Sequence, residues 1–221
     1  MSGNNELVAQ SVKVDAASAL GDVLGSGPIA TPDGKTVTVD GYLIGQLSLP
    51  SGRIVAADGF IMFDAKPFSR TVKPGAYPVT VAVAQLGGDQ RIAFAQIRFL
   101  DRRISKWEMA VTDGQDPSKL KEDEIYAYGV DSGTGSFADI GAQEVLSARD
   151  ARKLVDDVMK EMKKVYEPTR DWVVVNTPKG SAVLFSSGWG DGGYASYFGL
   201  DDNGEPVVLV TDFQVIDWKR R

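Results

Sequence analysis

The chain has 221 residues, of which 43% are hydrophobic and 24% charged, and its formal net charge is −6 at pH 7. Such a composition is typical of a globular protein with one well-buried core. The excess of acidic side chains argues against nucleic acid as a partner, because binding to phosphate groups requires a basic face.

Neither cysteine nor histidine occurs in the sequence. Without cysteine there are no disulfides or thiolate nucleophiles, and without histidine there is no Ser-His-Asp triad and no ordinary transition-metal site. An enzyme of this composition would depend on Asp, Glu, Lys, Tyr or Ser, or on a hard cation such as Mg²⁺ or Ca²⁺ held by oxygen atoms. The composition therefore favours a protein that is not an enzyme and has no cofactor.

The first residues carry no basic cluster, and no apolar run follows them, so we expect no signal peptide. No apolar stretch reaches the length that spans a bilayer. These patterns predict a cytoplasmic protein that does not bind membranes.

Residues 1–35 have the least regular pattern, although Asp15 is placed to cap a short helix ending at Leu24, and residues 31–34 have the composition of a turn. From residue 36 onwards the side chains alternate between apolar and polar or form short apolar runs. These patterns predict strands over 36–49, 53–57 and 60–63.

The clearest strand signal is a hairpin. Residues 77–86 and 91–100 are rich in β-branched and alternating side chains, and Gly87-Gly88-Asp89 between them is a turn sequence. A further strand over 104–112 is expected to extend this hairpin into an antiparallel meander, and a short strand over 125–130 follows.

One long amphipathic helix is predicted over 147–166. Ser147 and Asp150 have the spacing of a capping box, apolar side chains recur at helical spacing along one face, and Pro168 follows. Two more hairpins then follow, 172–176 with 181–186 and 194–200 with 206–216. We therefore expect a single α+β domain over residues 1–221, with mainly antiparallel sheets of about ten strands and this helix packed on a sheet face.

Two glycine-rich stretches, 129–139 and 187–194, each follow a predicted strand. Glycine is used where the backbone takes a positive φ or approaches another group closely, and loops at strand ends often carry binding sites. Neither stretch has the spacing of a dinucleotide or phosphate-binding loop. From them we take seven candidate binding residues: Asp131, Ser132, Thr134, Asp139, Trp189, Asp191 and Tyr194.

The last predicted strand supplies an eighth candidate, Asp212. Both faces of this strand are mostly apolar, so it is expected to be covered on both sides, and a carboxylate inside it needs hydrogen-bond donors. The backbone N–H groups of 188–193 are the expected donors. In the alternative, Asp131, Asp191 and Asp212 converge as a general-base site or as a site for Mg²⁺ or Ca²⁺.

Five stretches occur in a characteristic order along the chain: Pro-Gly-Ala-Tyr-Pro-Val at 74–79, Trp-Glu-Met-Ala at 107–110, Val-Asp-Ser-Gly-Thr-Gly at 130–135, Ser-Gly-Trp-Gly-Asp-Gly-Gly-Tyr at 187–194 and Val-Thr-Asp-Phe at 210–213. Together they resemble a mainly bacterial family of uncharacterised proteins, domain of unknown function 4241. The likeness covers residues 36–216, and the stretch at 187–194 is its most specific part. It implies one domain but brings no activity, cofactor or catalytic residue.

Two functions therefore stay open. The first is a binding or interaction protein without catalysis, for example an acidic immunity- or inhibitor-type protein that docks on a basic toxin. The alternative is an Asp-dependent hydrolase, or a small-molecule or divalent-cation binding protein, that uses the 129–139 and 187–194 loops. The sequence makes no prediction of the oligomeric state.

Overall fold

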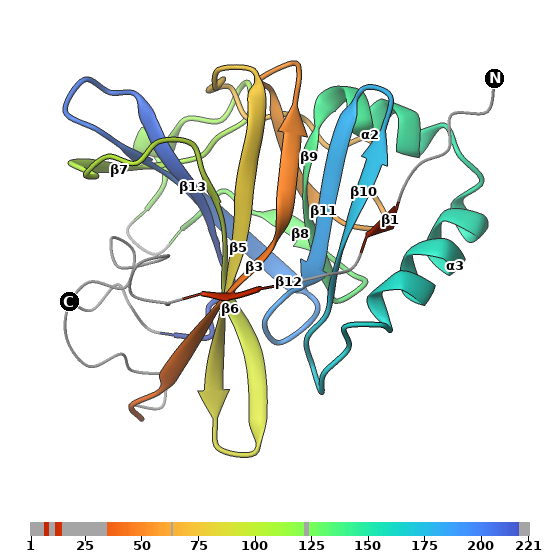
Figure 1. Ribbon diagram of the computed structural model, residues 1–221. Coiled ribbons are helices and arrows are strands. Elements are labelled where there is room, and N and C mark those ends of the chain that lie inside the picture. The colour runs from red at the N-terminus through yellow and green to blue at the C-terminus, as the bar shows by residue number, and fades with distance from the viewer. Residues whose placement is uncertain (1–6, 9–11, 15–34, 63, 122–123, 217–221) are drawn as a thin grey trace.

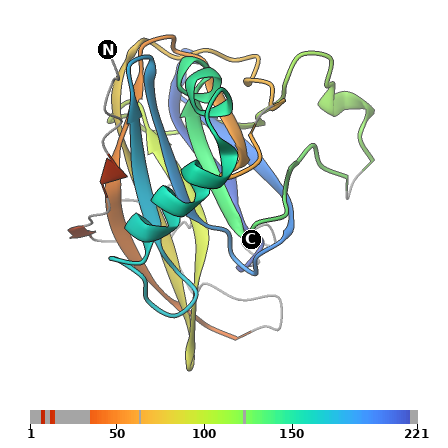
Figure 2. The ribbon, with the colours of Figure 1, turned by 90° about the vertical axis from the view of Figure 1, so that its right-hand side faces the viewer.

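The computed structural model of the chain describes residues 7–8, 12–14, 35–62, 64–121 and 124–216. They form three layers: an eight-stranded sheet packs face to face on a five-stranded sheet, and two helices cover the outer face of the smaller sheet (Figure 1). Figure 2 shows the second helix, α3, lying across the strands of the smaller sheet. The prediction of mainly antiparallel sheets covered by helix is confirmed.

All strand pairs formed by the described residues are antiparallel. The smaller sheet has the order β1 (Leu7–Val8), β10 (Trp172–Thr177), β11 (Gly180–Ser186), β9 (Thr134–Asp139) and β4 (Ile54–Asp58). The larger has the order β2 (Val12–Val14), β3 (Thr38–Leu49), β5 (Gly75–Leu86), β6 (Asp89–Arg98), β13 (Pro206–Asp212), β12 (Gly192–Leu200) and β7 (Lys106–Met109), and β8 (Tyr128–Val130) also pairs with β12. The helices are α2 (Ile140–Ser147), α3 (Ala151–Met162) and the short 3₁₀ helix η1 (Pro117–Lys119).

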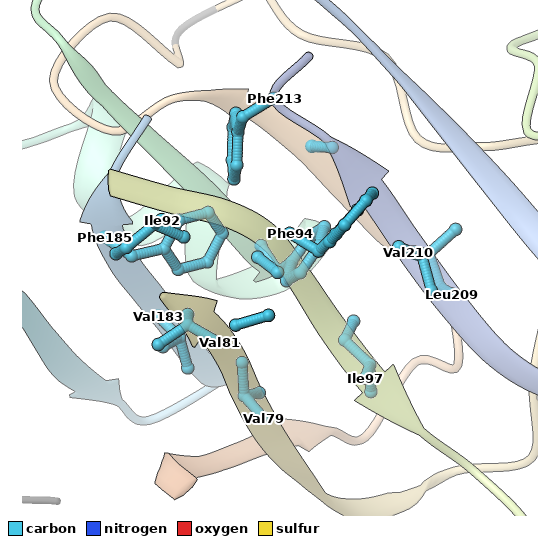
Figure 3. Close-up of a cluster of buried hydrophobic side chains, with 14 of the residues drawn as sticks. Val79, Val81, Ile92, Phe94, Ile97, Val183, Phe185, Leu209, Val210 and Phe213 are labelled. Atoms are coloured by element: carbon cyan, nitrogen blue, oxygen red, sulfur yellow. The ribbon is translucent and has the colours of Figure 1, made fainter. Parts of the chain in front are cut away.

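The core between the two sheets is built from β-branched and aromatic side chains. Figure 3 shows part of it, with Val81 and Ile92 from the larger sheet near Val183 and Phe185 from the smaller one. The ring of Phe213 packs edge-on against Phe185, with the ring centroids 6.0 Å apart. Burying one such side chain stabilises the fold by about 1.5–3 kcal/mol.

A second apolar cluster lies between the smaller sheet and the helices. Leu146 of α2 and Leu154, Val158 and Met162 of α3 are buried in it, together with side chains from the outer face of the sheet. The apolar stripe that indicated a helix in the sequence therefore does pack on a sheet.

The prediction of one unbroken helix over 147–166 is wrong. Ser147 is the last residue of α2, and α3 begins only after Asp150, whose side chain accepts a hydrogen bond from the Lys153 amide at 2.8 Å. A residue that caps a helix N-terminus has a non-helical backbone conformation, so Asp150 divides the region into two helices.

Three strand predictions also need correction. The prediction of a loop over 129–139 is wrong for residues 134–139, which form β9, a strand buried along its whole length. The segment 104–112 contributes β7, which pairs with β12, so it does not extend the hairpin of β5 and β6; the second neighbour of β6 is β13. Residues 60–62 are not in a strand.

The three predicted hairpins, β5–β6, β10–β11 and β12–β13, are confirmed. The short helix and turn predicted within residues 15–34 lie outside the described residues. In the part of the chain that the structure describes, no helix is both long and apolar enough to cross a membrane.

Candidate functional site

The two glycine-rich stretches lie side by side. Strand β8 leads into the first, strand β12 leads out of the second, and the two strands pair, with Val130 opposite Gly192. At the other end of the contact, the Ser187 amide donates to the Gly133 carbonyl at 3.0 Å. The turn at 131–133 and the loop at 187–191 therefore form one continuous surface at the end of the sandwich.

The 187–191 loop is held by its own hydrogen bonds. The Gly190 amide donates to the Ser187 carbonyl at 2.7 Å, and the Tyr194 hydroxyl donates to the Gly190 carbonyl at 2.8 Å. Gly188 has a φ of +49°, and a Cβ there would lie 2.7 Å from the Cβ of Phe213. Only glycine fits that contact, so the loop is seated firmly on the core.

Tyr194 belongs to the core more than to the surface. It is buried, and its ring packs edge-on against Phe213 with the centroids 4.9 Å apart. Burial, together with the nearby charge of Asp191, raises the pKa of Tyr194, so its hydroxyl stays protonated and can keep donating to the loop.

Trp189, at the tip of this loop, is 54% exposed. The guanidinium of Arg91 lies 5.1 Å from the centre of its ring. Arg91 is in turn fixed by an ion pair with Asp89, with Nε and Oδ2 2.9 Å apart. A cation over an indole face contributes about 0.5–1 kcal/mol at an exposed site, so the Trp189 ring has a preferred orientation although it faces solvent.

The carboxylate that braces the glycine-rich surface is Asp58, which lies between the strands predicted over 53–57 and 60–63 and was not among the candidate residues. Its Oδ2 accepts hydrogen bonds from the amides of Asp131 and Ser132, both at 2.8 Å. Its Oδ1 accepts from the Ser132 hydroxyl at 2.8 Å and from the amides of Phe60 and Ile61 at 2.8 and 3.1 Å. Burial alone would raise the pKa of Asp58, but these hydrogen bonds outweigh it and hold the pKa below its usual value.

Asp212 is buried, at 4% exposure, in a strand covered on both faces, as predicted. Its Oδ1 accepts from the Gln214 amide at 2.8 Å. Gly188 and Tyr194 pack against Phe213, the next residue along, whose side chain points to the opposite face of the strand. Donation from the 188–193 amides to Asp212 therefore stays a prediction.

Asp139 and Thr134 are parts of the scaffold. Asp139 is fully buried and caps α2, since its Oδ1 accepts from the Gly141 amide at 2.7 Å. Its Oδ2 accepts from the Ser51 hydroxyl, also at 2.7 Å. Thr134 is buried at the start of β9.

Asp131 and Asp191 are exposed, and neither makes an ion pair with any described residue. Within the described ranges, no group of three or more carboxylates lies close enough to hold a metal ion. The convergence of Asp131, Asp191 and Asp212 considered in the sequence analysis is therefore not found.

Two larger cavities lie near the surface. One of about 310 Å³ adjoins Asp58 and is also lined by Ile61 and Tyr128. The other, of about 410 Å³, is lined by Tyr77 and Phe99 and by none of the candidate residues.

The fold and site thus define an α+β protein with two packed antiparallel sheets and a braced loop surface at one end. Residues 47–211 match the model of the family described as "Protein of unknown function (DUF4241)". The match covers more than half of the chain, so the chain belongs to this family, as its motifs suggested. No curated protein and no solved structure matches the chain.

Proposed function

We propose that this chain is an interaction protein without catalytic activity, which docks on a basic protein partner. The contact would be made by the surface around Trp189, Asp131 and Asp191, which we call the Trp189 surface.

The exposure of Trp189 carries this proposal. A large aromatic side chain that faces solvent on a firmly seated loop loses little conformational freedom on binding, and tryptophan is enriched among the residues that dominate binding energy. The loop is fixed by the contacts of Gly188 and Tyr194, so the ring is presented in a defined place before any partner arrives.

The charge of the surface favours a basic partner. Asp131 and Asp191 flank the loop contact, are exposed and have no cationic partner in the described part of the chain. The whole chain carries a net charge of −6. Complementary charges speed association, as in an immunity- or inhibitor-type protein docking on a basic toxin, which is the concrete version that we propose. A cytoplasmic location belongs to the same proposal and suits a chain without cysteine.

The bonding of the buried carboxylates supports binding over hydrolysis. Asp58, Asp139 and Asp212 all accept hydrogen bonds from backbone amides, so these carboxylate oxygens already have structural partners. A general base works best with a pKa near the working pH, whereas the pKa of Asp58 is held low.

Site-specific photocrosslinking in the native host tests the proposal. A photoreactive residue at position 189 is expected to capture one basic protein in stoichiometric yield. The control position is Asn203, exposed in the turn between β12 and β13, because the length of β12 places it about 30 Å away. Capture of the same protein at 203 but not at 189 would place the interface elsewhere.

Charge variants give the second arm. Asp131→Asn and Asp191→Asn should slow association with the captured protein, most strongly at low salt, whereas Asp202→Asn at the distant turn should not. Equal effects of all three variants would mean that only the total charge matters.

A further inference from the structure

Arg170, just before β10, is buried to 8% exposure, although it carries a full positive charge. Its guanidinium lies 4.7 Å from the ring centre of Tyr42 on β3 and 5.6 Å from that of Trp172 on β10. The side chain therefore occupies the seam between the two sheets, over an aromatic pair contributed by both.

The hydrogen bonding of this guanidinium is incomplete. Nε donates to the side-chain carbonyl of Gln90 at 2.8 Å. Within the described part of the chain, no carboxylate pairs with Arg170 and no acceptor receives its Nη1 or Nη2 hydrogens. These nitrogens are also not among the polar atoms that are sealed from solvent without a partner. Nη1 and Nη2 are thus unused by the described residues and are not sealed from solvent.

Arg70 also lies over an aromatic ring, but its guanidinium pairs with a carboxylate as well. Its guanidinium lies 5.9 Å from the ring centre of Phe198, and its Nη2 pairs with the Glu108 carboxylate at 2.7 Å. Arg170 has the aromatic support but lacks the carboxylate. A buried charge without a partner is costly, so its persistence calls for a further partner.

The backbone that presents Arg170 is strained. Thr169 has a φ of +69°, which is rare for a β-branched residue. It is held there by a tight turn, in which Glu167 and Arg170 exchange two backbone hydrogen bonds of 3.0 Å, and by the Thr169 hydroxyl, which donates to the Gln90 carbonyl. Strained backbone of this kind is concentrated at ligand sites, where the surroundings fix it.

We propose that Arg170 is the binding site for the carboxylate group of a small-molecule ligand, which Nη1 and Nη2 would hold through two parallel hydrogen bonds. A guanidinium fork matches both carboxylate and phosphate. Asp89, close to Thr169, is already paired with Arg91, and the acidic residues Glu167 and Asp171 are close to Arg170 in the sequence. In a chain of net charge −6, these acidic neighbours favour the singly charged carboxylate over a more highly charged anion. This site is independent of the Trp189 surface, and either can fail without the other.

The test is a titration of the full chain followed by ¹⁵N NMR, with sodium acetate as the probe. Acetate up to about 100 mM should shift the Arg170 Nε–Hε and Trp172 indole signals in a saturable way, whereas sodium chloride at the same ionic strength should not, and phosphate should act more weakly. Arg170→Lys, which keeps the charge but loses the fork, should weaken acetate binding at least tenfold. Arg70→Lys, the matched control, should leave it unchanged.

Absence of a saturable shift in the wild-type chain would overturn the proposal, even if Arg170→Lys fails to fold. The same shifts with chloride would show an adventitious anion only, and stronger binding of phosphate would overturn the assignment to a carboxylate. Equal loss in Arg70→Lys would show that acetate is not bound at Arg170.

Discussion

Asp58→Asn should be one of the most destabilising single-atom changes in this protein. The side-chain amide has nearly the shape of the carboxylate, but its NH₂ group would replace an oxygen that accepts two backbone amides, whichever way it turns. Each buried amide left without an acceptor costs about 1–3 kcal/mol. We expect a loss of about 3–5 kcal/mol, a large part of the 5–15 kcal/mol typical of a folded domain.

Urea unfolding of the wild type, Asp58→Asn and Asp131→Asn measures this loss. Asp131→Asn is the matched control, because it keeps the amide that donates to Asp58 while changing an exposed side chain, and it should alter the free energy of unfolding by no more than about 0.5 kcal/mol. A loss below about 1 kcal/mol in Asp58→Asn would refute the bracing role, since the amides would then have other acceptors.

The pH dependence gives a second check on Asp58. Its pKa is lowered in the folded chain, so its contribution is fully present above the unfolded-state value of about 3.9 and is lost as the pH falls through the folded-state pKa. The difference in stability between wild type and Asp58→Asn should therefore be constant near neutral pH and shrink in acid. A difference that grows in acid would contradict the direction of the shift.

Gly188→Ala should lower the free energy of unfolding in urea by about 2–4 kcal/mol, because the new Cβ would clash with Phe213 and the residue has a positive φ. Gly129→Ala, with open space around the new Cβ, should lower it by about 1 kcal/mol or less. Equal losses would show that the loop is not seated on the core. Asp139→Ala should cost about 2 kcal/mol, more than Asp150→Ala at an exposed cap, and the reverse order would disprove the bracing of Ser51 by Asp139. In thermal unfolding, millimolar Mg²⁺ or Ca²⁺ should stabilise the chain no more than Na⁺ of equal ionic strength. A bound ion at 100 times its dissociation constant would add about 2.7 kcal/mol and would revive the cation-site alternative.

The hairpins could be predicted from the sequence because their signals are local. The Gly87-Gly88 turn and the strands beside it lie within about two dozen residues, and alternation together with turn chemistry specifies such a unit. The neighbours of β6 and β12 depend on contacts between distant segments, for which one sequence carries no local signal.

The helix and β9 show where local patterns mislead. The apolar stripe begins at Ala151, and Ser147 was predicted as the first residue of the same helix. In the structure Ser147 ends α2, and Asp150 caps α3. In β9, three of the six residues are Thr, Gly and Ser at 134–136, which resembles a loop, yet pairing with β4 on one side and β11 on the other buries all of them.

The sequence predicted the type of contact at the candidate site but did not identify the carboxylate that makes it. A buried carboxylate that braces a glycine-rich loop was expected at Asp212, and the structure shows this role for Asp58, which was not among the candidate residues. The two loop amides that donate to Asp58, those of Asp131 and Ser132, lie 73 and 74 positions further along the chain, so only the fold could reveal these contacts. Arg170 likewise carries no motif, and its aromatic neighbour Tyr42 comes from the other sheet.

The central claim, docking through Trp189, is tested most directly by isothermal titration of the captured partner with wild type and Trp189→Ala. Loss of an exposed side chain and one cation–π contact should change the free energy of unfolding by no more than about 1 kcal/mol. If Trp189 is the main contact, Kd should rise at least about 30-fold, which corresponds to a loss of about 2 kcal/mol. An unchanged Kd in a folded Trp189→Ala variant would contradict the claim.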